Sequence, residues 1–150
     1  MATTIKVTGL RELQARLDLL SSEVQLKLAA RATAAAAAVV KKSAKQRAPV
    51  ADAPYKFQGV LVQPGNIARN IISKRLRNTS HTAEHIVAVR GKKKYGYASR
   101  VGSLQEFGTV KQSPQPFLRP AFEANLGKAI DAMKKNLAAG IAKAAKGGKS

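Results

Sequence analysis

An alanine-rich segment constrains the fold of this chain more strongly than any other feature. Residues 29–40 consist almost entirely of alanine and valine, interrupted by Arg31. Alanine has the highest helix propensity, and its small side chain lets another backbone approach closely. The helix is predicted to begin at Ser22, which has the spacing of a capping box with Gln25, and to end before Pro49. A long helix that packs closely against a sheet or a neighbouring subunit is therefore expected.

Shorter elements are predicted around this helix. Alternating side chains at residues 5–7 predict a short first strand that stops at Gly9. Leucines spaced by three and four residues then predict a helix over residues 10–20. Residues 49–65 contain several prolines and glycines, and we expect a loop there with extended pieces around residues 55–62.

Two strands and one more helix complete the pattern. Alternation over residues 72–78 and 84–89 predicts a pair of antiparallel strands. Residues 95–101 fit either a strand or a short helical turn. An amphipathic helix is predicted after Pro120, through Ile141.

These elements predict one α+β domain. The fold class is a small, mostly antiparallel sheet packed by a long N-terminal helix and a C-terminal helix. The chain has 150 residues, which is long enough to bury a core. We expect the domain to occupy residues 1–143 and a flexible basic tail to occupy residues 144–150.

Charge is the extreme property of the composition. The chain has 27 Lys and Arg against 8 Asp and Glu, a formal net charge of +19. Such a charge favours polyanions or acidic protein surfaces as partners and opposes self-association at low salt. The absence of cysteine excludes disulfides and thiolate metal sites, and it fits assembly in a reducing cytoplasm. The start shows no secretory signal and the alanine run is too short to span a bilayer, so we expect a soluble protein without a membrane partner.

One motif suggests metal chemistry and is better explained without it. His81, Glu84 and His85 match the His-x-x-Glu-His pattern of inverted zinc peptidases, which needs both histidines on one helical face. Here the motif leads directly into residues 86–89, which are predicted to be a strand, and no third-ligand motif follows. The chain also lacks a phosphate-binding glycine loop and a cysteine nucleophile. We therefore expect no enzyme activity, no metal and no cofactor.

Basic residues gather in three places. Those at the end of the long helix suit the negative end of its dipole, and others surround the first strand of the predicted pair. The third group lies around an expected hairpin tip and is a candidate contact for DNA or for an acidic partner. Its members are Arg90, Lys92, Lys93, Lys94 and Arg100. A mobile tip of this kind can touch phosphates without reading bases, and the alternative is a solubilising loop.

The residues from Glu106 onward predict a docking loop. Glycine after an aromatic residue in Glu106-Phe107-Gly108-Thr109 indicates a turn. Prolines then hold the chain extended, and Phe117 and Leu118 lie between two of them. The candidate docking residues are Glu106, Phe107, Gly108, Thr109, Pro116, Phe117, Leu118, Arg119 and Pro120. Taken singly, these pieces also fit a tight connection and the lead-in to a helix.

These motifs, in this order, resemble the tail-completion (head–tail joining) family of long-tailed, siphovirus-type bacteriophages. The resemblance is carried by residues 7–10 with Leu13, Ala44-Lys45, Ala48-Pro49, residues 65–71, Tyr97-Ala98, residues 106–109 and residues 116–122. Asn70 stands where the family usually has serine. The spacing from Tyr97 to Glu106 is longer than the family pattern, so residues 102–104 look like an inserted turn.

The resemblance implies a structural virion protein that joins the tail to the head. Members of the family assemble as rings, commonly hexamers, at the head-proximal end of the tail. The implied partners are further copies of the chain, a head-completion or connector protein, a tail terminator or tail tube protein, and DNA in the channel. A closed ring needs two different complementary patches on each subunit. The docking loop and the alanine-lined helix are the candidates for them.

The charge supports a rival interpretation. A basic, histone-like protein that binds DNA without sequence preference would also carry +19 charges and an alanine/lysine tail. The docking motifs are largely uncharged and the basic residues are spread over the whole chain, which favours the tail-completion interpretation.

Overall fold

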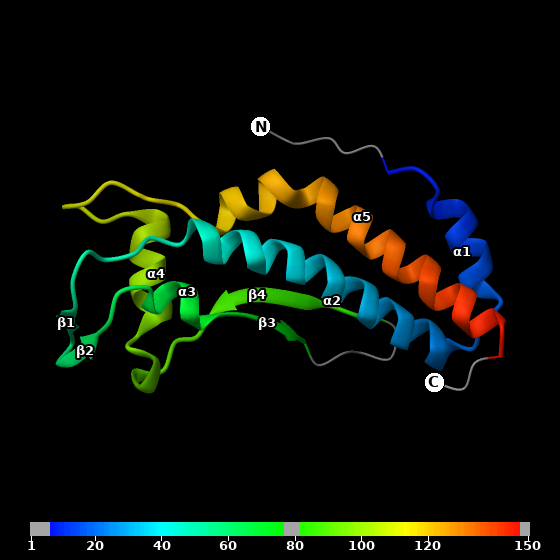
Figure 1. Ribbon diagram of the computed structural model, residues 1–150, viewed down its shortest axis with the longest axis horizontal. Coiled ribbons are helices and arrows are strands. Elements are labelled where there is room, and N and C mark those ends of the chain that lie inside the picture. The colour runs from blue at the N-terminus through cyan, green and yellow to red at the C-terminus, as the bar shows by residue number, and fades with distance from the viewer. Residues whose placement is uncertain (1–6, 77–81, 148–150) are drawn as a thin grey trace. The chain divides into compact units, whose positions relative to one another are not determined.

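The computed structural model describes residues 7–76 and 82–147, and its contacts divide the chain into two compact units. Unit 1 comprises residues 1–39, 75–86 and 126–150, and unit 2 comprises residues 40–74 and 87–125. The elements, labelled in Figure 1, are α1 (Leu10–Asp18), α2 (Ser22–Arg47), β1 (Tyr55–Phe57), β2 (Val60–Val62), α3 (Asn66–Asn70), β3 (Ile71–Arg75), β4 (His85–Val89), the 3₁₀ helix η1 (Lys93–Tyr95), α4 (Ala98–Phe107) and α5 (Leu118–Ala145). The predicted α+β class is confirmed, with the strands divided between two two-stranded sheets.

Unit 1 contains α1 and parts of α2 and α5. The side-chain amide of Gln25 donates to the carbonyl oxygens of Leu17 at 3.1 Å and Leu20 at 2.8 Å. Gln25 therefore ties the first turn of α2 to the end of α1 and the connection that follows it, which is a different use from the predicted capping box with Ser22. The predicted first strand lies largely outside the described residues, and Val7 belongs to no strand.

Small residues allow α2 and α5 to pack closely in unit 1. Leu28 and Ala32 of α2 are buried, as are Ala129 and Ile141 of α5. A Cβ atom built on Gly140 would lie 2.5 Å from Cδ2 of Leu28, so a side chain at this position would force Leu28 to move. The alanine-rich helix thus packs closely against a helix of its own chain.

Two hairpins contribute the strands. In the β1–β2 hairpin, Tyr55 pairs with Val62 and Phe57 with Val60. Gln58 and Gly59 form the connection with φ of 48° and 76°, the two positive values that suit a two-residue turn between twisted strands. The β3–β4 pair confirms the predicted strands; β3 ends at Arg75, and residues 77 and 78 of the predicted strand lie outside the described residues.

The segment after β4 differs from the prediction. Arg90–Lys94 is not a hairpin tip, because β4 is followed by η1 and then by α4 rather than by another strand. The inserted turn expected at residues 102–104 is also wrong, since these residues are helical. Gly102 is buried, and a Cβ atom there would lie 3.5 Å from Cζ of Phe117. Gly102 is therefore a helical residue beside the core, where a Cβ atom would make ordinary van der Waals contacts.

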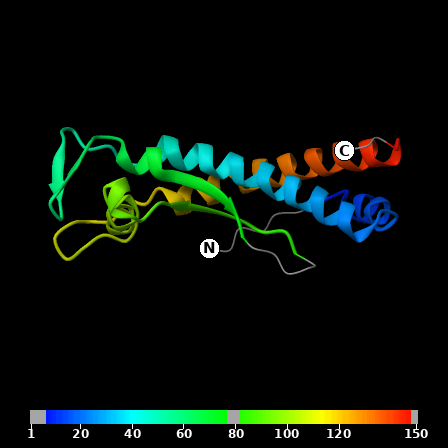
Figure 2. The ribbon, with the colours of Figure 1, turned by 90° about the horizontal axis from the view of Figure 1, so that it is seen from below.

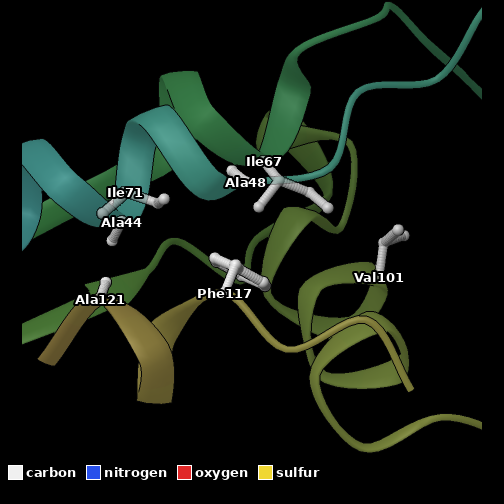
Figure 3. Packing of buried hydrophobic residues seen from close by; sticks show 7 residues of the cluster. All are labelled: Ala44, Ala48, Ile67, Ile71, Val101, Phe117 and Ala121. Carbon is white, nitrogen blue, oxygen red and sulfur yellow. The ribbon is translucent and has the colours of Figure 1, made fainter. Parts of the chain in front are cut away.

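The core of unit 2 is built around Phe117, which is 0% exposed. Figure 3 shows it between α2, α3, α4 and the start of α5, with the buried neighbours Ala44, Ala48, Ile67, Ile71, Val101 and Ala121. Asn125 also joins α5 to α2 by donating to the hydroxyl of Ser43 at 2.8 Å. The last helix begins at Leu118, earlier than predicted, and includes Pro120 in its first turn, where the missing N–H of proline leaves no bond unmade.

Candidate docking surface

Glu106 is the structural centre of the predicted docking segment. Its carboxylate accepts hydrogen bonds from the backbone N–H groups of Phe117 at 2.7 Å, Leu118 at 2.9 Å and Arg119 at 3.0 Å. These are the N-cap and the first two residues of α5, and the next residue, Pro120, has no N–H. The free N–H donors at this helix start are therefore satisfied by one side chain from the end of α4.

The electrostatics of Glu106 follow from these bonds. Partial burial acts to raise the pKa of Glu106, but the hydrogen bonds from Phe117, Arg119 and Leu118 and the charge of Arg119 outweigh it, so the pKa lies below its ordinary value. A negative charge at a helix start is also favoured by the helix dipole. Glu106 is thus an ionised structural cap in this fold.

Gly108 ends α4 in a conformation that only glycine adopts easily. Its φ is 75°, and a Cβ atom there would lie 2.8 Å from the backbone nitrogen of Pro114 and 2.9 Å from the carbonyl oxygen of Gln112. Thr109 and Gln112 then form a bridge, with N–H to carbonyl bonds of 2.8 and 3.2 Å in the two directions. The predicted turn is confirmed, and it leads into a second, tight turn that the sequence patterns did not predict.

This tight turn displays apolar side chains. Phe107 is 70% exposed, and Val110 at the turn is fully exposed. Gln105 supports the turn because its carbonyl oxygen accepts from the N–H of Gln115 at 2.7 Å. Val110 was not among the predicted docking residues; the signal that could have found it is a β-branched residue placed between Gly108 and Pro114.

A groove in unit 2 lies beside this turn. Figures 1 and 2 show the β1–β2 hairpin and the loop after α4 at the same end of the unit. Apolar side chains from the loop after α2, from β1 and from α3 and α4 line the groove together with several glutamines. The lining includes Pro49, Val50, Tyr55, Gln63, Ile67, Leu104, Gln105, Thr109, Gln112 and Gln115. Val50 and Leu104 are among the exposed large apolar residues, so this region offers apolar surface from several segments.

Phe117 does not belong to this surface. It was predicted as a docking residue because it lies between two prolines, but its side chain fills the core of unit 2. Leu118 is half-buried and packs against the same core, while Pro116 and Arg119 are exposed. The sequence could not reveal this difference, because an aromatic residue next to proline fits either an anchor in the core or an anchor for a partner.

The predicted basic residues surround η1. Arg90, Lys92, Lys93, Lys94 and Arg100 are all exposed. The guanidinium carbon of Arg90 lies 5.0 Å from the centre of the Tyr95 ring, and Nζ of Lys94 lies 4.9 Å from it. The hydrogen bond from Lys94 lowers the pKa of Tyr95 most strongly; burial opposes this effect, and the charges of Lys94, Arg90 and Lys92 add to it.

The histidine motif does not form a peptidase site. His85 lies in β4, where its Nδ1 is 2.9 Å from Oγ1 of Thr33, so the motif lacks the helix that the zinc geometry requires. His81 lies outside the described residues. Among residues 7–76 and 82–147, no group of three or more His, Cys, Asp and Glu side chains is arranged to hold a metal ion. Within the same ranges, no helix has both the length and the apolar character needed to cross a membrane.

Comparison with known proteins identifies the family. The family model described as "Bacteriophage HK97-gp10, putative tail-component" matches residues 11–108, which run from the second residue of α1 through α4 to the turn glycine Gly108. The turn at Val110, the Phe117 core residue and α5 follow the matched region. No curated protein and no solved structure matches the chain. Since the match covers more than half of the sequence, the chain belongs to the HK97 gp10-like family of bacteriophage tail components.

Proposed function

We propose that this protein is a structural, non-catalytic subunit of the virion that forms a ring at the head-proximal end of the tail and joins the tail to the head. The family match over residues 11–108 carries the proposal, because it assigns the chain to the tail components of bacteriophages. In this role the protein acts at the head–tail junction and assembles in the host cytoplasm. Its partners are further copies of itself, in a ring that is commonly a hexamer, a head-completion protein, and a tail terminator or tail tube protein.

The surface of unit 2 supports this proposal. A ring subunit needs apolar patches that are complete before assembly and held in a fixed geometry, because ordering a loop on binding reduces affinity. Phe107 and Val110 meet this need: the first ends a helix, and the second lies in a hydrogen-bonded turn. The proposed docking surface therefore consists of Phe107, Val110 and the adjacent groove, and Glu106, Gly108 and Phe117 maintain its shape.

The test of the function is deletion of this gene from the phage, followed by electron microscopy of the lysate. Separate filled heads and complete tails are the expected result. Normal joined virions would contradict the proposal and favour the rival interpretation, a basic protein that binds DNA without sequence preference.

The docking surface is tested by complementing the deletion with variants. Phe107→Ser and Val110→Ser should leave the fold intact and prevent head–tail joining. Leu19→Ser is the matched control, since Leu19 is an exposed leucine of unit 1 outside the proposed surface. If the unit 2 variants restore joined particles as well as the control does, this surface is not the site of docking.

A further inference from the structure

The exposed basic residues around η1 form no ion pair with a carboxylate of the described residues. The two ion pairs found among the described residues join Arg16 to Glu12 and Lys27 to Glu23, both in unit 1. Unit 2 contains fourteen lysines and arginines against three aspartates and glutamates, a net charge of +11. One of these three carboxylates, Glu106, is already bound to the start of α5. Unit 2 therefore has strong positive charge with few internal counter-charges.

The backbone that carries these cations is held at several points. The N–H of Arg90 donates to the carbonyl of Asn70 and the carbonyl of Arg90 accepts from Ser99, both at 3.0 Å. Asn66 donates from its side chain to the carbonyl of Tyr95 at 3.0 Å. Gly96, with φ of 60°, lets the chain pass close to Asn66, since a Cβ atom would lie 2.9 Å from that amide nitrogen. The turn is thus a preorganised platform, in contrast to the mobile tip expected from the sequence.

Two of the cations are also brought to one aromatic ring. Arg90 and Lys94 both lie about 5 Å from the centre of the Tyr95 ring, at 5.0 and 4.9 Å. Like charges that share one ring repel each other, and an anion bound between or above them would relieve this repulsion. The arrangement therefore favours a ligand with closely spaced negative charges.

The surroundings distinguish nucleic acid from acidic protein as that ligand. Protein interfaces have an apolar core with a polar rim, whereas nucleic-acid interfaces are polar and strongly positive. None of the exposed large apolar residues lies within residues 90–100, a segment that is described throughout. The exposed large apolar residues of unit 2 all lie outside this segment; they are Val50, Leu61, Leu104, Phe107, Val110 and Phe122. The apolar docking surface and the basic turn are therefore chemically distinct surfaces.

We propose that the turn formed by Arg90, Lys92, Lys93, Lys94 and Tyr95 is a binding site for the phosphate backbone of DNA, without sequence preference. The site differs from the docking surface in its chemistry, and the proposal does not depend on ring formation or head–tail joining. The lysines and Arg90 contact phosphate oxygens, and Tyr95 holds two of the cations in place.

The test measures binding of a short labelled DNA duplex to the full-length protein by fluorescence anisotropy. Measurements over about 50 to 200 mM salt give the slope of log affinity against log salt, which reports the number of phosphate contacts. Replacing Lys92, Lys93 and Lys94 by glutamine should make this slope less steep by about 3, at roughly 1 for each lost contact, and should weaken binding at every salt concentration. The triple arginine variant should retain the affinity.

The matched control replaces Lys128, Lys135 and Lys146 by glutamine, three exposed lysines of unit 1 that cause the same change in net charge. Equal losses in the two triple variants would overturn the proposal, because binding would then reflect net charge alone. Binding of an acidic peptide to this turn, together with no binding of DNA there, would also overturn the proposal, in favour of a protein partner.

A second measurement uses the unmodified protein and does not depend on the stability of a variant. Amine-reactive labelling with and without DNA, read by mass spectrometry, should show DNA protecting Lys92, Lys93 and Lys94 more than Lys128, Lys135 and Lys146. Equal protection of both groups would contradict the proposed site.

Discussion

The cap formed by Glu106 allows a quantitative prediction for the variant Glu106→Gln. Glutamine keeps the length of the side chain but has one acceptor oxygen and one donor NH₂ group in place of two acceptor oxygens. In the native protein Oε2 accepts two bonds, from Phe117 and Leu118, and Oε1 accepts one from Arg119. If the amide oxygen takes the place of Oε2, the NH₂ group faces the N–H of Arg119 and that bond is lost together with the charge.

The expected loss of stability follows from these contacts. Hydrogen bonds to charged groups contribute about 1.5–3 kcal/mol each when buried, and the loss of an N-cap typically costs about 1 kcal/mol. Because Arg119 is exposed, water can replace the bond that it loses. We therefore expect Glu106→Gln to lower the free energy of unfolding by about 1–2 kcal/mol, which corresponds to a fall in Tm of about 2–8 °C for a chain of this size.

The effect should depend on pH in a defined direction. The folded pKa of Glu106 lies below its ordinary value. Its contribution to stability is therefore complete above the unfolded pKa of about 4.3 and is lost as the pH falls through the lower folded pKa. The difference in Tm between the native protein and Glu106→Gln should be largest near neutral pH and should shrink in acid.

Thermal unfolding followed by circular dichroism checks both statements. The matched control is Glu123→Gln, because Glu123 is an exposed residue of α5 and its replacement changes the net charge equally. A Glu106→Gln variant that melts like Glu123→Gln at neutral pH would refute the capping argument. A difference that persists unchanged in acid would refute the role of the ionised carboxylate.

Two further predictions compare residues of the same type. In urea denaturation, Phe117→Ala should lower the free energy of unfolding by about 3–5 kcal/mol, because Phe117 is buried. Phe107→Ala should change it by less than about 0.5 kcal/mol, because Phe107 is exposed. Equal effects would contradict the assignment of Phe117 to the core. Gly108→Ala should destabilise the protein by more than about 1 kcal/mol, because Gly108 has a positive φ and close neighbours. Gly127→Ala should stabilise it by about 0.5–1 kcal/mol, because Gly127 lies on α5 with open space around it. Thermal melts in which both variants shift Tm in the same direction would contradict this account.

Local patterns predicted the elements well. The alanine run, the leucine spacing and the alternation before and after residue 80 correspond to α2, α1 and the β3–β4 pair. These signals succeed because helix propensity and side-chain periodicity act over a few residues. The structure of the segment from Lys93 to Phe107 was difficult to predict, because local signals of this kind do not show how a glycine packs against distant residues. Gly96 and Gly102 look alike in sequence, but the first lies in a turn with positive φ, while the second is a helical residue packed under Phe117.

The predicted turn at Gly108 is confirmed, but the roles of the residues in the segment 106–120 could not be read from the sequence. Whether an aromatic residue faces the core or the solvent depends on packing with distant elements. Phe117 meets residues of α2, α3 and α4, and Phe107 has no such neighbours to cover it. The cap between Glu106 and the start of α5 joins residues 11 to 13 positions apart, a range at which neither helical nor strand periodicity gives a signal.

The structure gives a physical reason why Glu-Phe-Gly-Thr and Pro-Phe-Leu-Arg-Pro occur together in this chain. Glu106 binds the start of α5, so the end of one helix is tied to the beginning of the next. Gly108 lets the chain leave α4 without a clash, and the residues between the two motifs form the exposed turn that carries Val110. In this arrangement Phe117 points inward and Phe107 outward. A substitution at Glu106 should therefore disturb assembly indirectly, because it weakens the hydrogen bonds that fix the positions of Phe107 and Val110.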